Sequence, residues 1–464
     1  MDVELEELFY HPVPRWVSWL DFLGFVDAFL FVNQAITGML LATRYRPSVA
    51  AAAGNLPDAY RSLVEIMSVP AGPLIRGLHF WGANAVVVLV FLHTLRVFYI
   101  GAYKRPRQAT WTLGVLLGIV TVLFAFSGYL LPWDQQAYWA TTVGTAMSTY
   151  APLIGRWLVE LARGGAYISG LTLTRFYALH TMFLPALFLL LFAGHLALVM
   201  RHGLAEVEEA LPASYRKHHV RGKRDDLPTG FVPFWPSTVF RMALLVLLLG
   251  VILVALAVTF KPGLGSPADP LNRENYQPVP VWYFLSIYQF LKYLPGRLDA
   301  LGIVGIPLVA AVVLLGLPYF DRNPSRRPGK RPLAVGAGLV VVLGMATFTY
   351  LGWNSITPAR GGTAVKEHPG FSADIRPVFQ VNCANCHTGR KKSGGLDLGS
   401  YASLMKGGNT GPVVKPGDPA GSLLVQALEG RTTDVTPMPL GQQPLPATRI
   451  QSIKNWIRDG ALDN

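Results

Sequence analysis

Apolar residues in this chain of 464 residues gather into about seven stretches separated by polar connections. The stretches cover roughly 22–43, 79–100, 111–131, 175–200, 239–260, 300–319 and 333–353. An α-helix rises about 1.5 Å per residue, so about 20 apolar residues cross the hydrocarbon core of a bilayer. The pattern therefore predicts an all-α protein, a polytopic membrane helix bundle with about seven or eight transmembrane helices.

Composition and charge sharpen this picture. Hydrophobic residues make up 51% of the chain, and the net charge is +13. We expect no nucleic-acid partner, because much of the basic charge lies in short loops between apolar stretches. The loops after the second, fourth and sixth stretches are richest in Lys and Arg, which places the N-terminus in the cytoplasm and the C-terminus outside. The acidic start of the chain is unlike a cleavable signal peptide. We expect the inner membrane of a bacterium.

Two pairs of histidines lie inside the apolar stretches. His79 and His93 are fourteen residues apart, and His180 and His195 are fifteen apart. A helix turns about 100° per residue, so both spacings return the second imidazole near the first one's face, about 21–23 Å further along. Intramembrane ionisable residues are rare and usually functional. The pattern predicts a four-helix core that holds two haems, His79 with His180 near the outer surface and His93 with His195 near the inner surface. A proton path or another metal is the alternative.

Two long connections lie on the expected outer side. Residues 132–174 begin with PWDQQAYWATTVG and contain Pro and Gly breaks, so we expect short surface helices. Residues 261–299 contain PVPVWYFLSIYQFLKYLP, an aromatic and amphipathic stretch. An aromatic belt at the membrane interface is the simplest explanation of that composition.

After Trp353 the composition changes to a polar linker with Gly and Pro, over residues 356–369. Residues 370–464 follow as a soluble all-α domain that contains CANCH. C-x-x-C-H is the attachment signature of a c-type haem, here with Cys383 and Cys386 as thioether partners and His387 as axial ligand. Zinc or a redox dithiol is the alternative, but zinc would need a fourth ligand, and only His368 is near.

The sixth position of that iron favours a soft thioether. Met438 lies in the Pro-flanked TPMPL loop and is favoured over Met405, which lies in an expected helix or turn. The last segment, ATRIQSIKNWIRDG, is amphipathic and is expected to pack on the CANCH helix.

Residues of about 15–205 resemble the cytochrome b subunit of Rieske/cytochrome b complexes of the bc and b–f type, especially the chloroplast and cyanobacterial form. The matching stretches are TRYRPSV, LIRGLHFW, LHTLRVF, KRPRQATW, SGYLLPWDQ and TLTRFYALHT. Residues of about 225–355 resemble the small subunit that completes the fold there, through GSPADPLN and VWYFLSIYQFLKYLP. The resemblance implies a dihaem domain at 1–205 and a three-helix domain at 206–355, before the linker and the cytochrome c domain.

The resemblance also implies roles for residues around the haems. The His79/His180 haem would have the lower potential and the His93/His195 haem the higher one. Three arginines match family positions near haem propionates, with interfacial anchoring as the alternative: Arg76, Arg96 and Arg175. Three glycines could let a flat macrocycle approach the backbone, with helix packing as the alternative: Gly24, Gly38 and Gly128.

The resemblance also implies an outer quinol pocket. It would lie between the segment Gly128–Trp133, which includes Tyr129, the surface helices that follow, and the segment of Pro280, Val281, Trp282 and Tyr283. The family carries an acidic residue at position 281 that is thought to accept a quinol proton, and a valine cannot do so. Either Asp269, Glu274, Tyr283 or a water chain replaces it, or quinol oxidation there is altered or absent. Tyr283 is a poor plain base, since the reference pKa of tyrosine is about 10.

Two further positions depart from the chloroplast form. That form attaches a third haem through a Cys in the first span, where this chain has Phe22 and no span holds a Cys, so the third haem is not expected. Phe80 replaces a basic residue.

Together these features favour the cytochrome b subunit, with fused cytochrome c, of a quinol:cytochrome c oxidoreductase that translocates protons. A Rieske iron–sulfur protein on another chain would take one electron. The other would cross both b-haems to quinone near Arg201 and His202. The c domain would pass electrons to a soluble cytochrome c or a terminal oxidase, and the family implies a dimeric complex. A non-bifurcating dihaem quinol dehydrogenase is the alternative. A seven-span transporter or receptor fits the histidines and CANCH poorly.

Overall fold

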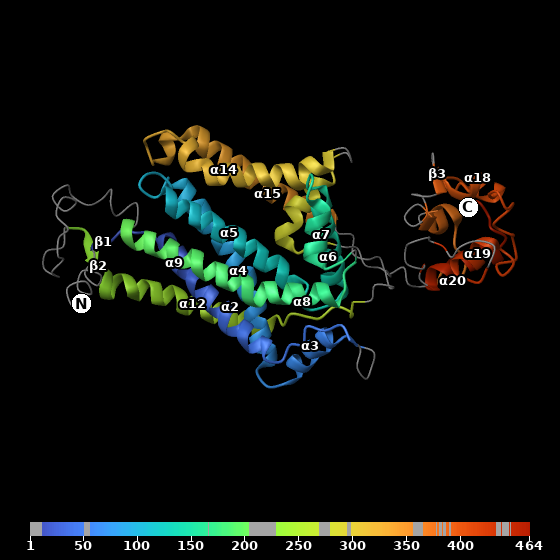
Figure 1. The fold of residues 1–464 in the computed structure, drawn as a ribbon, viewed down its shortest axis with the longest axis horizontal. Helices are drawn as coiled ribbons and strands as arrows, with labels where there is room; N and C mark the ends of the chain where they lie inside the picture. The colour runs from blue at the N-terminus through green and yellow to red at the C-terminus, as the bar shows by residue number, and fades with distance from the viewer. Residues whose placement is uncertain are drawn as a thin grey trace. The chain divides into compact units, whose positions relative to one another are not determined.

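The computed structural model describes the chain except for residues 1–11, 51–55, 166, 204–228, 269–278, 295–297, 356–364, 377, 380–382, 384–386, 389–390, 433–437, 439–444 and 446. The chain divides into two compact units. One consists of Met1–Pro267 and Pro278–Ser355, and the other of Ala268–Gln277 and Ile356–Asn464. Figure 1 shows both units, which are described separately below.

Seven helical segments in the described residues are long and apolar enough to cross a membrane. They are Trp19–Ala42, Gly72–Tyr99, Gln108–Tyr129, Gly170–His202, Phe234–Thr259, Leu301–Phe320 and Pro332–Ser355. Each overlaps one of the apolar stretches, so the predicted all-α membrane bundle is confirmed.

The centre of the first unit consists of α2 (Leu23–Ala42), α4 (Gly72–Tyr99), α5 (Gln108–Tyr129) and the helix that runs through α8 (Gly170–Ala178), η3 (Leu179–Phe183) and α9 (Leu184–His202). Helix α2 packs along α4, and α5 packs along α9 (Figure 1). A buried cluster of Leu30, Val86 and Leu253 joins α2 and α4 to α12 (Val239–Thr259). Apolar side chains thus hold α4, which carries His79 and His93, against α2 and α12.

The remaining helices flank this centre. α14 (Ile306–Phe320) packs on α5, and α15 (Pro332–Ser355) packs on α13 (Leu285–Leu291). Shorter turns are η1 (Trp19–Phe22), η5 (Phe234–Thr238), η6 (Trp282–Phe284), η8 (Leu301–Gly305) and η9 (Pro328–Lys330). A small antiparallel pair joins β1 (Pro12–Pro14) to β2 (Phe231–Pro233).

Short helices fill the connections at one end of the bundle, as expected for residues 132–174. They are α3 (Asp58–Ser68), α6 (Gln135–Met147), η2 (Ser148–Tyr150) and α7 (Gly155–Arg163). Asp134 caps α6 by accepting a hydrogen bond from the Ala137 amide at 2.8 Å. The Gln135 amide donates to the Ser266 carbonyl at 2.9 Å, which joins the PWDQ turn to the segment after α12.

A buried polar cluster joins the connections at the opposite ends of the spans. The Lys104 ammonium lies 2.9 Å from the Asp321 carboxylate, and Arg331 donates to the Tyr103 hydroxyl at 2.9 Å. Burial opposes ionisation of Asp321, but hydrogen bonds from Tyr103 and Lys104 hold its pKa below the usual value. The cluster fixes the α4–α5 connection against the α14–α15 connection.

The C-terminal unit has its own apolar core. Its elements are η10 (Phe371–Ile375), β3 (Lys391–Lys392), η11 (Ser393–Gly395), α18 (Tyr401–Lys406), α19 (Leu423–Leu428) and α20 (Ala447–Arg458). Helix α20 buries Ile450, Ile453, Trp456 and Ile457 in that core, as its amphipathic pattern predicts.

Candidate haem sites and quinol pocket

Four intramembrane histidines face one another in two pairs. His79 and His93 lie on α4, His180 lies in η3, and His195 lies on α9. The ring centres of His79 and His180 are 6.3 Å apart, with an angle of 72° between the rings. Metal–imidazole bonds are about 2 Å long, so two imidazoles on opposite sides of one metal ion have ring centres roughly 6 Å apart. His93 and His195 are near enough to interact electrostatically.

The unequal spacing of the two pairs has a local cause. α4 is a regular helix between His79 and His93, whereas His180 lies in the π-helical turn η3. A π-turn closes at i→i+5 and adds a residue to the helix. Pro185 is the second residue after this turn and lacks a backbone N–H, which favours such a break in the α-helical ladder. The turn therefore accommodates the fifteenth residue, and both helices present their histidines at matching levels.

Each histidine ring lies against a glycine of a neighbouring helix. A Cβ added at Gly24 or Gly38 of α2 would lie 3.1 Å from Cε1 of His93 or 3.2 Å from Cε1 of His79. On α5, a Cβ at Gly114 would lie 3.2 Å from Cε1 of His195. At Gly128 it would lie 2.6 Å from Cε1 of His180, closer than real side chains approach. The four glycines thus leave room for ring systems beside α2 and α5, and the residues present fit haem.

Gly114 was not among the predicted residues, although the sequence held a signal for it. Gly114 precedes Gly128 by fourteen residues, the same interval that separates Gly24 from Gly38. This repeat matches the histidine spacing on α4. A search for glycines at the histidine interval would have found all four.

Three of the histidine rings have Nδ1 within hydrogen-bond distance of a protein oxygen. The Thr37 hydroxyl donates to the Asn33 carbonyl at 2.6 Å and lies 2.9 Å from Nδ1 of His79, so it accepts from that nitrogen. Likewise, the Ser127 hydroxyl donates to the Phe124 carbonyl at 3.2 Å and lies 3.1 Å from Nδ1 of His180.

The third ring, His195, lies with Nδ1 3.0 Å from the Thr110 carbonyl, which can only accept. Each of the three rings thus has an oxygen that can accept from Nδ1, an arrangement that leaves the lone pair of Nε2 for a metal. Nδ1 of His93 has no hydrogen-bond partner within the described part of the chain.

The three predicted arginines lie near these rings in sequence and donate to protein groups. Arg76 donates to the Gly263 carbonyl at 3.0 Å and to the Pro262 carbonyl. Arg175 donates to the Glu160 carbonyl at 2.9 Å. Arg96 forms an ion pair with Asp21, a buried residue of η1. Contact of these arginines with propionates stays a prediction.

The predicted quinol pocket brings together the end of α5 and the turn η6. Gly128 and Tyr129 end α5. Phe126, one turn earlier, contacts Phe284 with ring centres 6.5 Å apart. Pro280, Val281 and Tyr283 are half-buried.

Trp282, which is partly exposed, donates its indole N–H to the side-chain oxygen of Asn84 on α4 at 2.7 Å. Because an indole nitrogen only donates, this contact fixes the orientation of the Asn84 amide. Asn84 was not predicted, and a single asparagine on an apolar helix gave no signal for it.

The proton acceptor of this pocket is not a carboxylate at position 281. Burial raises the pKa of Tyr283 to about 12, so its phenol keeps its proton near neutral pH. Asp269 and Glu274, the other candidates, lie outside the described residues.

At the other end of the bundle, Arg107 donates to the His202 carbonyl at 2.6 Å and to the Gly203 carbonyl at 3.3 Å. This contact caps the end of α9, next to Arg201 and His202. It places a buried guanidinium beside the predicted inner quinone site.

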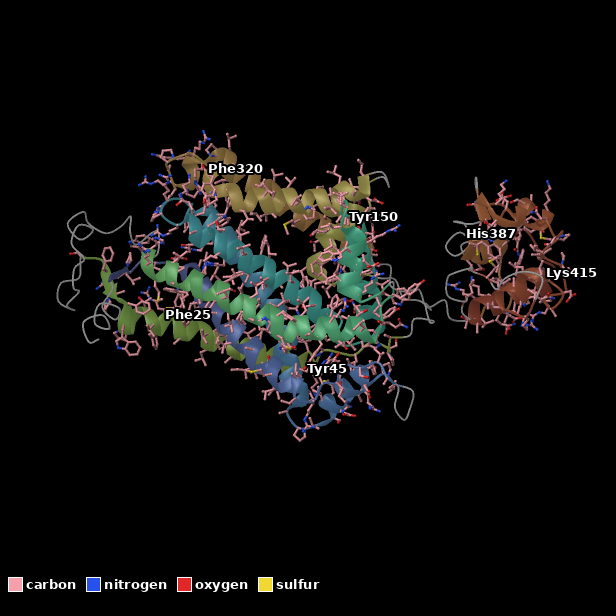
Figure 2. The ribbon with its side chains drawn as sticks, viewed as in Figure 1. Phe25, Tyr45, Tyr150, Phe320, His387 and Lys415 are labelled. Atoms are coloured by element: carbon pink, nitrogen blue, oxygen red, sulfur yellow. The ribbon has the colours of Figure 1, made fainter. Side chains whose placement is uncertain are left out.

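In the C-terminal unit, the structure describes two residues of the CANCH motif, Cys383 and His387. The His387 amide donates to the Cys383 carbonyl at 2.9 Å, and Nδ1 of His387 is buried with no hydrogen-bond partner in the described residues. Cys383 and Met438 both pack against the core, as does Met405. Cys386 lies outside the described residues. Figure 2 labels His387 among the side chains of this unit.

Comparisons with known proteins agree with this geometry. Residues 8–203 match the family model described as cytochrome b/b6/petB, and residues 267–366 match cytochrome b(C-terminal)/b6/petD. Residues 383–439 match the model described as Planctomycete cytochrome C.

The chain is 33% identical over 348 residues to the cytochrome bc complex cytochrome b subunit of Chlorobaculum thiosulfatiphilum, covering 75% of this chain and 76% of that one. It is 40% identical over 197 residues to the menaquinol:cytochrome c reductase cytochrome b subunit of Geobacillus thermodenitrificans, covering 42% of this chain and 85% of that one. A solved structure titled hyperthermophilic respiratory Complex III is similar, with a TM-score of 0.64 and 28% identity over 75% of this chain and 87% of that one.

Proposed function

The chain belongs to the cytochrome b family, and we propose from this premise that it is the cytochrome b subunit, with a fused cytochrome c, of a quinol:cytochrome c oxidoreductase. One observation carries the proposal: four histidines in two facing pairs, each ring seated against a glycine of the neighbouring helix. That arrangement would offer two imidazoles to hold a haem iron, with glycines beside the rings, at each of two levels. We infer two non-covalent b-haems, at His79/His180 and at His93/His195.

Bound haem at these levels supplies reversible one-electron transfer. The chain's own residues prepare for it: Nε2 is left free to bind iron, and the hydroxyls of Thr37 and Ser127 hold the rings of His79 and His180 in one orientation. Such partners of ligating histidines typically change metal affinity by about 10–100-fold. Arg76, Arg96 and Arg175 are proposed to bind propionates, for which a guanidinium offers two parallel donors.

Oxidation of a quinol to a quinone releases two electrons and two protons, so the pocket needs a route for each. The segment 280–284 and the end of α5 would enclose the quinol ring. Asn84 holds this segment against α4, the helix that carries His79, through Trp282. Since Val281 cannot take a proton and Tyr283 keeps its own, we propose that the protons leave through water or through the carboxylates of the 269–274 segment.

The C-terminal unit is proposed to carry a covalent c-haem on Cys383 and Cys386, and His387 and Met438 would hold its iron. The chain holds only these two cysteines, so a Rieske iron–sulfur centre would have to come from another chain. We place the complex, as a dimer, in a bacterial inner membrane with the cytochrome c domain on the outer side. A soluble cytochrome c or a terminal oxidase would accept its electrons.

The test is the reduction of the b-haems when a short-chain quinol is added to the purified complex, with and without an inhibitor of the inner site. Reduction that persists with the inner site blocked, and that requires an oxidised high-potential partner, supports a bifurcating outer site. Reduction only through the inner site supports the linear quinol dehydrogenase, which Val281 favours. A complex whose b-haems quinol never reduces contradicts both.

A further inference from the structure

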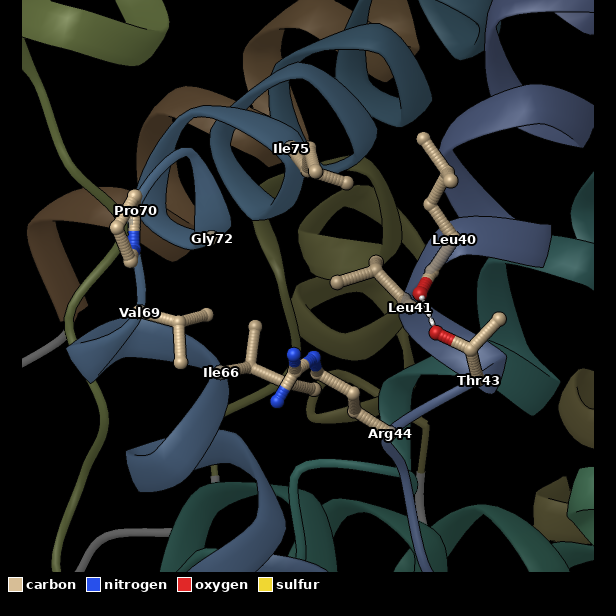
Figure 3. Close-up of a pocket in the computed structure, with 9 residues that line it drawn as sticks. All are labelled: Leu40, Leu41, Thr43, Arg44, Ile66, Val69, Pro70, Gly72 and Ile75. Carbon is tan, nitrogen blue, oxygen red and sulfur yellow. Dashed lines mark hydrogen bonds between the residues drawn. The ribbon is translucent and has the colours of Figure 1, made fainter.

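A cavity of about 290 Å³ opens between the end of α2, helix α3 and the start of α4 (Figure 3). The spans end here, because α2 finishes at Ala42 and α4 begins at Gly72. Most of the lining is apolar: Leu40, Leu41, Ile66, Val69, Pro70, Gly72 and Ile75, with Thr43 and Arg44 as the polar members. The volume is just below the range that is typical of ligand pockets, about 300–1,000 Å³.

The polar groups of the cavity differ in what they already bind. The Thr43 hydroxyl donates to the Leu40 carbonyl at 2.7 Å, so its proton is in use. The Arg44 guanidinium extends into the cavity beside Ile66 (Figure 3) and has no ion-pair or hydrogen-bond partner within the described ranges, whereas the Arg44 backbone amide donates to the Leu41 carbonyl at 3.1 Å. By contrast, the neighbouring Arg46 lies 2.7 Å from Glu65, and Arg61 is paired with Asp58. Of the three arginines Arg44, Arg46 and Arg61, Arg44 is therefore the one whose guanidinium can pair with an external anion.

An apolar surface continues from the cavity along α2. Ile36, Met39 and Leu40 are 50%, 64% and 48% exposed, and they follow the helical spacing of three or four residues toward the middle of the span. This surface would face hydrocarbon. A ligand that fills the cavity and follows α2 must combine an anionic head with a long apolar tail.

We propose that this cavity binds an anionic phospholipid, with the phosphate on Arg44 and an acyl chain along Ile36, Met39 and Leu40. Guanidinium groups bind phosphate through paired N–H donors, and a membrane supplies this ligand at high local concentration. A neutral quinol would leave the guanidinium without a counter-charge. The cavity adjoins the outer haem level, because Leu41 lies one turn from Gly38 and Ile75 directly precedes Arg76. The b-haem content of each variant therefore has to be measured beside its lipid binding, so that loss of the lipid is distinguished from loss of haem.

The experiment uses native mass spectrometry of the whole complex, delipidated in detergent and titrated with dioleoyl phosphatidylglycerol. Arg44→Gln should weaken one tightly bound phosphatidylglycerol by roughly 10- to 100-fold, the value expected for hydrogen bonds to a charged group. Arg46→Gln is the matched control, because its guanidinium is paired with Glu65, and it should bind like the wild type. Val69→Phe fills the cavity from the opposite wall and should lose the same lipid while keeping Arg44.

Three outcomes would overturn the proposal. Equal retention of phosphatidylglycerol by the wild type and Arg44→Gln would show that the guanidinium binds no headgroup. Equal binding of phosphatidylcholine and phosphatidylglycerol would show an apolar groove without charge selectivity. Displacement of the lipid by millimolar inorganic phosphate would indicate a free-phosphate site. The b-haem spectrum of each variant verifies that the bundle has folded.

Discussion

Gly128→Ala tests the most crowded contact of the haem sites. The added Cβ would lie 2.6 Å from Cε1 of His180, whereas ordinary contacts begin near 3.4 Å. The imidazole would have to retreat by about 0.8 Å, which is several times the tolerance of about 0.2 Å in metal–ligand distances. Overpacking of this kind costs about 1–3 kcal/mol, or roughly 5- to 150-fold in haem affinity. We expect the variant to lose the haem at the His79/His180 level.

The assay is the b-haem content of the purified complex, measured by the pyridine haemochrome method and by redox difference spectra. Gly128→Ala should retain about one b-haem per chain instead of two, because the second level lies about 21 Å further along the bundle. Gly118→Ala on the same helix is the matched control, since its Cβ would meet nothing nearer than Cγ1 of Val90 at 4.0 Å. Gly114→Ala, with its contact at 3.2 Å, should fall between them. Two unperturbed b-haems in Gly128→Ala would refute the close-approach argument.

Three other substitutions probe separate parts of the account. Thr37→Val removes the hydroxyl that lies 2.9 Å from Nδ1 of His79, so haem at that level should bind about 10–100-fold more weakly. Haem titration of the stripped complex measures this affinity, and an unchanged value would count against the orienting role of Thr37. Tyr283→Phe should leave the pH profile of quinol oxidation unchanged from pH 6 to 9, because the pKa of about 12 keeps the phenol protonated throughout; loss of an ionisation in that window would show that Tyr283 titrates there. Asp321→Asn should destabilise the folded state by about 3–5 kcal/mol at pH 7, because it leaves the buried Arg331 without its carboxylate. Because the pKa of Asp321 is lowered in the folded state, this stabilisation is complete above pH 4 and disappears as the pH falls. The thermal melting temperatures of the wild type and the variant should therefore converge in acid. A difference that stays constant with pH would contradict the role given to the Asp321 carboxylate.

The bundle and the histidine pairs could be predicted because they depend on helical periodicity, which the sequence displays directly. Seven apolar stretches gave the spans, and the spacing of His79 with His93 gave a shared face. The extra residue between His180 and His195 was visible in the sequence, but its accommodation by the π-turn η3 depends on the local backbone near Pro185.

Contacts between segments that are distant in the chain could not be predicted from the sequence. Thr37 and Ser127 are ordinary helix residues until the structure brings their hydroxyls to imidazoles 42 and 53 positions away. Asn84 meets Trp282 across 198 positions, and the Arg44 cavity forms only where three helices meet. The family resemblance supplied the role of the 280–283 segment, and it also exposed Val281 as the departure that most affects the chemistry.

The most direct test of the central claim, that two histidine pairs and CANCH hold haems along one electron path, is the haem stoichiometry of the purified chain. The pyridine haemochrome spectrum should show two b-haems for each c-haem, with the c-haem alone remaining on the polypeptide after acid–acetone extraction. A chain with a c-haem and no b-haem, or with b-haem retained after His79→Leu and His93→Leu are combined, would contradict the account.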